Sequence, residues 1–215
     1  MFVRRLLARQ LARPSGLPGF FMARTLDRVN ERVNRLALEQ LALAPHERLL
    51  EVGFGGGLLI RQALAAVPDI RVTGIDVSQP MLDRARRTFR HPIESGHVEI
   101  TEADVASIPS ASNRFDKAAA INTLHFWPDA GAGLAEVRRV LKPGGVFVMA
   151  VRPKEFLDRV KFTALGFRAF EDAELLRLLD AAGFERTVIE HHPDRDMGTV
   201  HAIARKAVAP AAKAG

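Results

Sequence analysis

The fold is decided by the stretch Leu49-Leu50-Glu51-Val52-Gly53-Phe54-Gly55-Gly56-Gly57, an apolar run that enters a glycine-rich turn. The run predicts a buried strand, and a helix is expected to begin near Gly57. Glycines permit positive φ and let a ligand touch the backbone, while the start of a helix offers free N–H groups. The stretch therefore predicts a ligand-binding turn, and a tight turn that binds nothing is the alternative.

A second apolar strand, residues 71–75, is followed by Asp76, which lies nineteen residues after Gly57. Nucleotide-binding α/β folds place the acid that binds the ribose hydroxyls at about this distance. A carboxylate there can accept both hydroxyls in charge-assisted hydrogen bonds. We expect Asp76 to bind a ribose; a cap-like role before Ser78 is the alternative.

The glycine pattern separates two kinds of adenosyl cofactor. A nicotinamide fingerprint requires a third glycine at the sixth position of G-x-G-x-x-G, where this chain has Leu58. Instead, Glu51 precedes glycines at positions 53, 55 and 57. A carboxylate repels a pyrophosphate but attracts an ammonium group. The turn therefore favours a cofactor that carries an ammonium group.

Outward from the turn, short apolar runs alternate with helical stretches, a pattern typical of βαβ units. Strands are expected over residues 48–52, 71–75, 97–101, 115–121, 145–151, 186–190 and 200–204, with helices between them and another helix over residues 25–43. The last two strands have no helix between them and predict an antiparallel pair. The predicted fold is α/β: a Rossmann-like, seven-stranded, mostly parallel sheet with a C-terminal antiparallel hairpin and an N-terminal helical cover.

The composition excludes several kinds of chemistry. The 215 residues include no Cys and no Tyr, which removes disulfides, thiol nucleophiles, thiolate metal ligands and phenolic acid–base groups. Most of the net charge of +6 lies in the first 26 residues, which hold five arginines and no acid. Because the rest of the chain is nearly neutral, we expect no nucleic-acid partner. No apolar run approaches the length of a membrane span.

Three segments are predicted: a basic N-terminal arm or lid (1–24), one domain (25–206) and a disordered tail (207–215). Arginines interrupt any apolar region of a secretory signal in the arm. The arm is interpreted as a cover over the pocket, a membrane-surface or targeting helix, or a frayed terminus. We expect a cytoplasmic protein, with peripheral membrane contact through the arm as an alternative. No sequence pattern here points to a particular oligomeric state.

Several motifs occur together along the chain. They are the 51–57 turn, Val72-Thr-Gly-Ile-Asp76-Val-Ser78 with Met81-Leu82, Glu102-Ala103-Asp104-Val105 with Ile108-Pro109, Arg114-Phe115-Asp116, Asn122-Thr-Leu-His125-Phe-Trp-Pro-Asp129, and Glu136-Val-Arg-Arg-Val-Leu-Lys-Pro-Gly-Gly145. With these motifs the chain resembles the class I S-adenosylmethionine-dependent methyltransferases over about residues 25–205. It is most similar to their ubiquinone/menaquinone-biosynthesis-like branch, which methylates small molecules.

The resemblance implies S-adenosylmethionine as the cofactor, bound at the carboxyl ends of the strands. It implies Glu51, Gly53, Phe54, Gly55 and Gly57 for the methionine part, Asp76 for the ribose, Val77 and Met81 for the adenine faces, Asp104 for the adenine amino group, the Val105 amide for a ring nitrogen, and Asn122 for the ammonium group and the entering acceptor. The chain departs from the family pattern at Phe54, where a small residue or Cys is common, and at Phe126, where the branch often has a second His. The first departure predicts a tighter, drier methionine pocket.

The implied reaction is an in-line methyl transfer to a small, hydrophobic molecule, with an O-, N- or C-acceptor left open. His125 is the candidate base or acceptor-positioning residue, and a histidine packed at a strand end is the alternative. The first 25 residues and residues 152–169 are candidate lids, with ordinary packing as the alternative. His191 and His192, near Asp194 and Asp196, are interpreted as a solvated turn, so no metal is predicted.

Three other functions compete with this interpretation. RNA or protein methylation is one, although the Asn/Asp-Pro-Pro-aromatic motif of base-amino methyltransferases is missing at Asn122. A non-catalytic module that keeps only the cofactor pocket is another. A nicotinamide oxidoreductase is disfavoured by Leu58.

Overall fold

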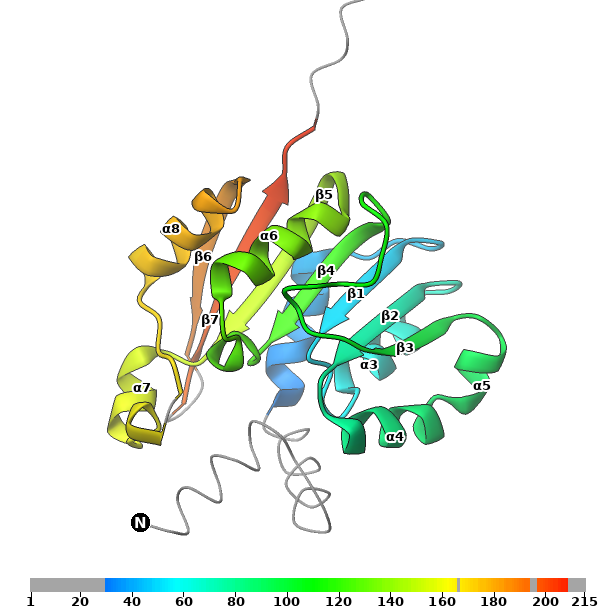
Figure 1. The fold of residues 1–215 in the computed structure, drawn as a ribbon, viewed down its shortest axis with the longest axis horizontal. Coiled ribbons are helices and arrows are strands. Elements are labelled where there is room, and N and C mark those ends of the chain that lie inside the picture. The colour runs from blue at the N-terminus through cyan, green and yellow to red at the C-terminus, as the bar shows by residue number, and fades with distance from the viewer. Residues whose placement is uncertain (1–29, 166, 194–196, 209–215) are drawn as a thin grey trace, which may run out of the picture.

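The computed structural model of the chain describes residues 30–165, 167–193 and 197–208. A single seven-stranded sheet crosses the molecule in the order β3-β2-β1-β4-β5-β7-β6 (Figure 1). The strands are β1 (Arg48–Val52), β2 (Arg71–Asp76), β3 (Val98–Glu102), β4 (Phe115–Ile121), β5 (Leu141–Val151), β6 (Phe184–His192) and β7 (Thr199–Lys206). The predicted arm, residues 1–24, and the part of the predicted tail beyond residue 208 lie outside the described residues.

The first five strands are parallel, and the last two run against them. Strands β1 to β5 pair side by side in the same direction, so their carboxyl ends meet at one edge of the sheet. Strand β7 pairs antiparallel with both β5 and β6. The predicted C-terminal hairpin and the predicted seven-stranded, mostly parallel sheet are therefore confirmed.

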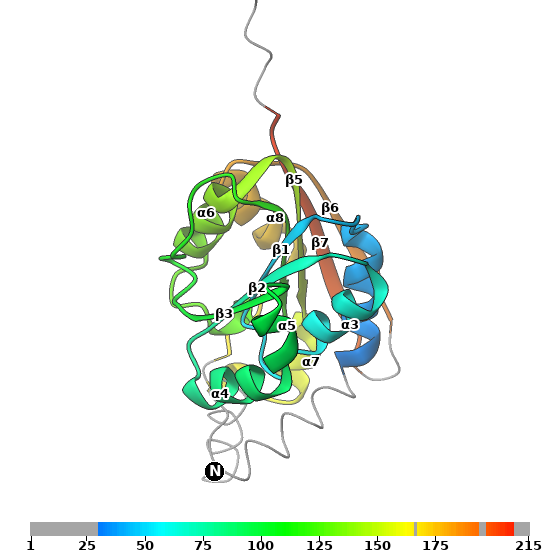
Figure 2. The same ribbon diagram turned by 90° about the vertical axis from the view of Figure 1, so that its right-hand side faces the viewer.

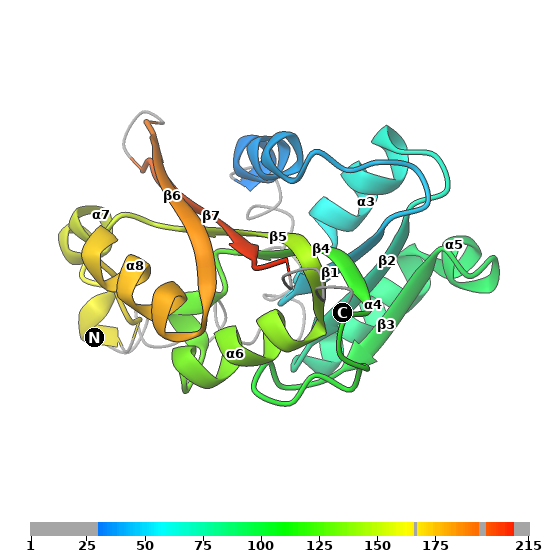
Figure 3. The same cartoon turned by 90° about the horizontal axis from the view of Figure 1, so that it is seen from above.

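Helices cover both faces of the sheet. The longer α-helices are α3 (Leu58–Ala66), α4 (Gln79–Thr88), α6 (Ala130–Val140) and α8 (Asp172–Ala181), with the shorter α5 (Arg90–Glu94) and α7 (Lys154–Arg159), the 3₁₀ turns η1 (Leu124–Phe126) and η2 (Thr163–Leu165), and an unlabelled helix over residues 30–41. Viewed from above, the helix over 30–41 and α3 lie on one face, and α6 and α8 lie on the other (Figure 3). Figure 2 shows the same layers edge on.

Successive side chains of a strand point to opposite faces of the sheet, so the strands contribute to two hydrophobic clusters, one on each face. On β1, Leu50 joins Leu134 of α6 and Leu175 of α8 in one cluster. Leu49 points to the other face and joins a cluster with Leu41 and with Leu59 of α3. The sheet is therefore buried on both sides, as expected for parallel strands.

The ends of two helices follow the sequence signals. Helix α4 has Pro80 within its first turn, where the missing N–H of proline breaks no helical hydrogen bond. Gly183, which follows α8, has φ +82° and takes the left-handed position that glycine favours after a helix. Pro80 thus marks the start of α4, and Gly183 marks the turn between α8 and β6.

The start of β5 differs most from the predicted strand bounds. The prediction places the strand at residues 145–151, after the sequence Pro143-Gly144, but β5 already begins at Leu141. Leu141 pairs with Phe115 of β4, and an irregularity in the register follows before Lys117 pairs with Val146. The proline lies in this irregular part, where a missing N–H breaks no ladder bond.

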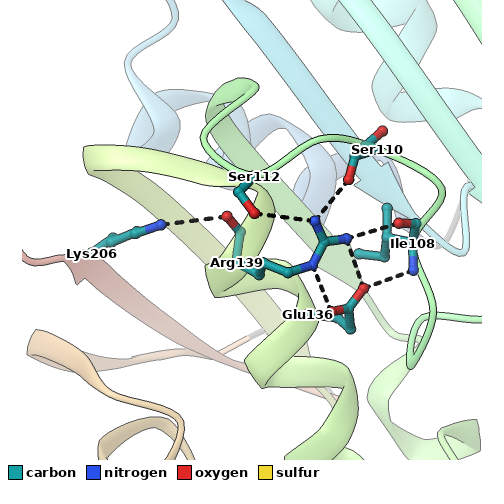
Figure 4. Close-up of polar contacts among 6 residues, drawn as sticks. All are labelled: Ile108, Ser110, Ser112, Glu136, Arg139 and Lys206. Carbon is teal, nitrogen blue, oxygen red and sulfur yellow. Dashed lines mark hydrogen bonds and ion pairs between the residues drawn. The ribbon is translucent and has the colours of Figure 1, made fainter.

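The loop between β3 and β4 is held to α6 by Arg139 and Glu136 (Figure 4). Arg139 donates from Nη2 to the carbonyl of Ile108 (2.9 Å) and from Nη1 to that of Ser110 (2.8 Å). Glu136 accepts from the N–H of Ile108 (3.0 Å), and its hydrogen bond with Arg139 lowers the pKa of the Glu136 carboxyl. The loop between β3 and β4 is thus fixed at its middle, at Ile108 and Ser110.

Across the described residues, no helix is long and apolar enough to cross a membrane.

Candidate functional site

The glycine turn after β1 lies at the sheet edge where the parallel strands end. Gly53, Gly55 and Gly57 have φ of +68°, +51° and +74°, which L side chains rarely adopt. A Cβ at Gly53 would lie 2.4 Å from Oγ1 of Thr123, and one at Gly57 would lie 2.6 Å from the ring of Phe89. A Cβ at Gly55 would meet nothing within 4 Å. The turn is therefore packed at both ends and open in the middle, as a backbone cradle for a ligand requires.

Asp76 ends β2 beside this turn. Its Oδ2 accepts from the N–H of Gly55 (3.0 Å), and its Oδ1 accepts from the N–H of Ser78 (2.9 Å). Burial raises the pKa of the Asp76 carboxyl, while these backbone hydrogen bonds oppose that rise. The predicted cap-like contact to Ser78 is present, but the second oxygen joins Asp76 to the glycine turn. Each oxygen keeps further lone-pair capacity for a hydroxyl donor.

The remaining residues implied for the adenosine part divide into exposed and buried ones. Val77, directly after Asp76, is 43% exposed. Asp104 is also exposed, and its Oδ1 accepts from the N–H of Ala106 (2.8 Å). Met81 and Val105 are buried, at 4% and 7% exposure. Val77 and Asp104 are accessible to a ligand, whereas the Met81 side chain mainly packs in the core.

Two residues at the end of β1 are buried. Glu51, the residue before the last in β1, is 3% exposed. Phe54 is 4% exposed and belongs to the hydrophobic cluster that contains Leu59 and Met81. A Cβ at Gly74 would lie 2.8 Å from Cδ1 of Phe54. The Phe54 ring thus lies under the turn and against β2, which argues against the expectation that it narrows the methionine pocket.

Asn122 follows β4 with a positive φ of +55°. Its N–H donates to the carbonyl of Ala150 (2.8 Å), and its Nδ2 donates to Oδ1 of Asn30 (3.0 Å). Left-handed backbone at a residue other than glycine is strained and is common at functional sites. The next residue, Thr123, contacts Gly53 and accepts from Nε1 of Trp127 (3.2 Å). Asn122 therefore lies beside the glycine turn, and its role toward the ammonium group stays a prediction.

His125 does not have the geometry of a base. The backbone N–H of Arg152 donates to its Nε2 (3.1 Å). The proton must then be on Nδ1, which donates to the carbonyl of Arg168 (2.7 Å). Burial and the charge of Arg152 lower the pKa of the imidazole. Both ring nitrogens are used by backbone groups, so the geometry favours the packed-histidine alternative over a base or an acceptor-positioning role.

The candidate lid after β5 contributes aromatic rings next to this histidine. The ring of Phe126 lies 4.8 Å from that of Phe167, and Phe162 lies 5.0 Å from Phe167, measured between centroids. Phe126 and Phe162 are partly exposed, and Phe167 is buried. Phe126, at the position where the family branch often has a second His, therefore belongs to an aromatic cluster with Phe162 and Phe167.

The histidines at the end of β6 belong to a strand rather than to the expected turn. His191 and His192 pair with Val200 and Thr199 of β7. Asp194 and Asp196 lie outside the described residues. Within the described part of the chain, no group of three His, Cys, Asp or Glu side chains could hold a metal.

The sequence analysis missed Asn30 and placed Arg152 only in the candidate lid over residues 152–169. Asn30 lies in the helix over residues 30–41, Arg152 directly follows β5, and Arg152 donates from Nη2 to Oδ1 of Asn30 (2.8 Å). A sequence signal for the helix existed, because Asn30 and Asn34 lie one turn apart on the face that carries the buried Val33, Ala37 and Leu41. Polar residues on an apolar face call for a specific partner.

Comparison with known proteins relates the chain to methyltransferases. Residues 50–149 match the methyltransferase domain family. The uncharacterized methyltransferase YdaC of Bacillus subtilis is 29% identical over 191 residues, which cover 88% of this chain and 98% of YdaC. Four O-methyltransferases of Pyrenophora, Penicillium and Aspergillus are 29–34% identical, and the chain spans only 45–56% of their length.

Solved structures share the fold over most of the chain. The [4+2]-cyclase SpnF is 25% identical with a TM-score of 0.71, over 83% of this chain and 81% of SpnF. The geranyl diphosphate C-methyltransferase of Streptomyces coelicolor, solved with S-adenosyl-L-homocysteine, is 16% identical with a TM-score of 0.72, over 83% of this chain and 80% of that one. The second likeness shows the fold alone.

The strand order, the turn after β1 and the acid after β2 define a Rossmann-like methyltransferase fold. Together with the domain match and the methyltransferase relatives, these features support a class I S-adenosylmethionine-dependent methyltransferase with S-adenosylmethionine as its cofactor. Membership of the ubiquinone-like branch stays a prediction.

The residues present fit this cofactor. Space is open above Gly55, and the Asp76 carboxylate is fixed beside it with acceptor capacity for a diol. In the described part of the chain, Oδ1 of Asn122 is a buried acceptor without a hydrogen-bond partner. An adenosyl ligand with a charged amino group offers a donor for each of these acceptors.

Proposed function

We propose that the protein transfers a methyl group from S-adenosylmethionine to a small, hydrophobic molecule by in-line displacement. The arrangement that supports this most directly is the open Gly55 turn held against Asp76, at the edge where α/β sheets bind ligands. The rings of Phe126 and Phe162, which both pack against the buried Phe167, support the hydrophobic acceptor, because they are partly exposed and present apolar surface beside the end of β4.

Each cofactor-binding residue has a proposed role. The carboxylate of Asp76 accepts the two ribose hydroxyls, and Val77 covers one face of the adenine. Asp104 accepts from the adenine amino group, and the Val105 amide meets a ring nitrogen. Glu51, the glycine turn and Asn122 hold the methionine part. The loop after β3 keeps Asp104 in place, because Arg139 anchors the loop a few residues further on, at Ile108 and Ser110.

When bound, the cofactor supplies an electrophilic methyl group on a sulfonium. The protein then needs no nucleophile of its own; it must align the acceptor, exclude water and let positive charge disperse. The partly exposed rings of Phe126 and Phe162 are suited to exclude water on the acceptor side. His125, held by Arg152 and Arg168, fixes the segment that carries Phe162 and Phe167.

The finer predictions about the chain are part of this proposal. We propose one methyltransferase domain over residues 25–206, preceded by a basic arm at 1–24 that serves as a lid or a peripheral membrane contact, in a cytoplasmic protein. RNA or protein methylation and a non-catalytic cofactor-binding role are the competing functions. The O-methyltransferases among the relatives support a small acceptor without naming it.

The test is to incubate the protein with methyl-deuterated S-adenosylmethionine and a metabolite extract, and to search by mass spectrometry for compounds that gain the label. We expect label in one class of apolar small molecules and none with the Asp76→Ala protein. Label in RNA or protein fractions alone, or in no fraction despite cofactor binding, would reject the proposal.

A further inference from the structure

Three side chains from distant parts of the sequence meet where β4 and β5 end. Oδ1 of Asn30, in the N-terminal helix, accepts from Nη2 of Arg152 (2.8 Å) and from Nδ2 of Asn122 (3.0 Å). Arg152, 8% exposed, also donates from Nη1 to the carbonyl of Gly198 (2.9 Å). The N-terminal helix thereby reaches a site that is otherwise built by the sheet.

This arrangement determines which way the amide of Asn122 faces. A guanidinium has only donors, so the atom of Asn30 that faces Arg152 must be its oxygen. The same oxygen faces Asn122, so Asn122 must present its nitrogen to Asn30. The oxygen of Asn122 therefore points away from Asn30, and in the described residues this buried atom has no hydrogen-bond partner.

A buried amide oxygen without a partner costs free energy, which a ligand donor can recover. The strand order indicates which donor this is. The ribose-binding acid ends β2, the glycine turn follows β1, and Asn122 follows β4, so the three lie in this order along the sheet edge. A ligand whose sugar lies at β2 and which crosses the turn has its amino-acid end at β4.

From this geometry we infer that Asn30 is a positioning residue: it holds the Asn122 amide with its oxygen toward the cofactor, where that oxygen accepts from the ammonium group of the methionine part. The inference rests on the proposed placement of the cofactor. It assigns a role in the site to a helix outside the matched domain, which begins at residue 50.

The test uses calorimetric binding of two probes to the full chain: S-adenosylhomocysteine, which has the ammonium group, and 5′-methylthioadenosine, which lacks the whole amino-acid part. Asn30→Leu should weaken S-adenosylhomocysteine binding about tenfold and leave 5′-methylthioadenosine binding unchanged. Asn30→Asp keeps an acceptor for both donors and should bind S-adenosylhomocysteine nearly as the wild type does. Glu31→Leu, at the exposed neighbouring position of the same helix, is the matched control.

A double-mutant cycle separates positioning from general damage. In an Asn122→Leu background, which has no amide to orient, Asn30→Leu should cause no further loss of S-adenosylhomocysteine affinity. Asn30→Ala replaces Asn30→Leu if the leucine variant does not fold, as judged by circular dichroism.

Unchanged S-adenosylhomocysteine affinity in Asn30→Leu, or an equal loss for both probes, would overturn the inference while the proposed function stands. Wild-type protein that binds neither probe would overturn both.

Discussion

The ring of Phe54 occupies the space that a side chain at Gly74 would need. A Cβ built on Gly74 would lie 2.8 Å from Cδ1 of Phe54, 3.1 Å from Cδ1 of Ile60 and 3.2 Å from Cδ1 of Ile100. The large residue in the ligand-binding turn is therefore matched by the absence of a side chain on the neighbouring strand. The Phe54 ring thus supports the turn on the side that faces β2, while the space next to Gly55 stays open.

Gly74→Val should destabilise the protein by about 1–3 kcal/mol, because the added methyl groups displace the Phe54 ring from a close-packed position. Denaturant unfolding measures this change. Phe54→Leu in the same chain should restore part of the loss, since the smaller side chain leaves room for valine. Independent, additive effects of the two substitutions would contradict the packing described here.

Asp76→Ala should weaken S-adenosylhomocysteine binding by tens of fold or more, because two charge-assisted hydrogen bonds to the ribose and the contact to Gly55 are lost together. Asp76→Asn should lose less, since one carbonyl oxygen remains. Calorimetry measures both, with Asp83→Ala on α4 as the control. Affinity that is unaffected by Asp76→Ala would exclude the proposed place of the ribose.

His125→Gln and His125→Asn should each keep one of the two backbone hydrogen bonds. We expect a loss of about 0.5–1.5 kcal/mol of stability for each and a pH–rate profile of unchanged shape, because the imidazole is already neutral and both its nitrogens are engaged. Unfolding curves and the pH dependence of kcat/KM measure these effects. A thousandfold loss of turnover with unchanged stability would instead identify His125 as the base.

His201 should make the protein sensitive to acid. Its side chain is fully buried, its Nδ1 donates to Oε1 of Gln40 (2.6 Å), and burial with the charges of His192 and Arg152 lowers its pKa from 6.5 to about 4. The unfolded chain then binds a proton at a higher pH than the folded chain, so the free energy of unfolding falls as the pH drops from above 6.5 toward 4.

Replacing His201 tests how much this residue contributes to the pH dependence of the free energy of unfolding. His201→Asn keeps an N–H for Gln40 but cannot ionise, so the loss of stability between about pH 8 and about pH 5 should be smaller than in the wild type by roughly 2 kcal/mol. Denaturant unfolding at the two pH values provides the comparison. An identical pH dependence in both proteins would mean that His201 does not carry it.

The local signals of the sequence predicted most of the fold. All seven strands and the antiparallel pair were predicted, because apolar runs and glycine or proline breaks report on neighbouring residues. The start of β5 was wrong, since the pairing of Leu141 with Phe115 depends on a partner strand and not on the local Pro-Gly-Gly sequence.

The site was predictable where a motif fixes the backbone and less so where packing fixes a side chain. Asp76 and the glycine turn meet as expected, because both follow adjacent parallel strands. The direction of the Phe54 ring depends on Gly74, and the hydrogen bonds of His125 depend on Arg152 and Arg168. Contacts between such distant positions leave no periodic signal in the chain.

The strand order also constrains when the sheet is completed during synthesis. Strand β7, which ends at Lys206, lies between β5 and β6, so β5 exposes an unpaired edge until the last described strand has left the ribosome. The earlier βαβ units can form as they emerge, but the nascent chain needs protection from aggregation at β5 until β7 closes that edge.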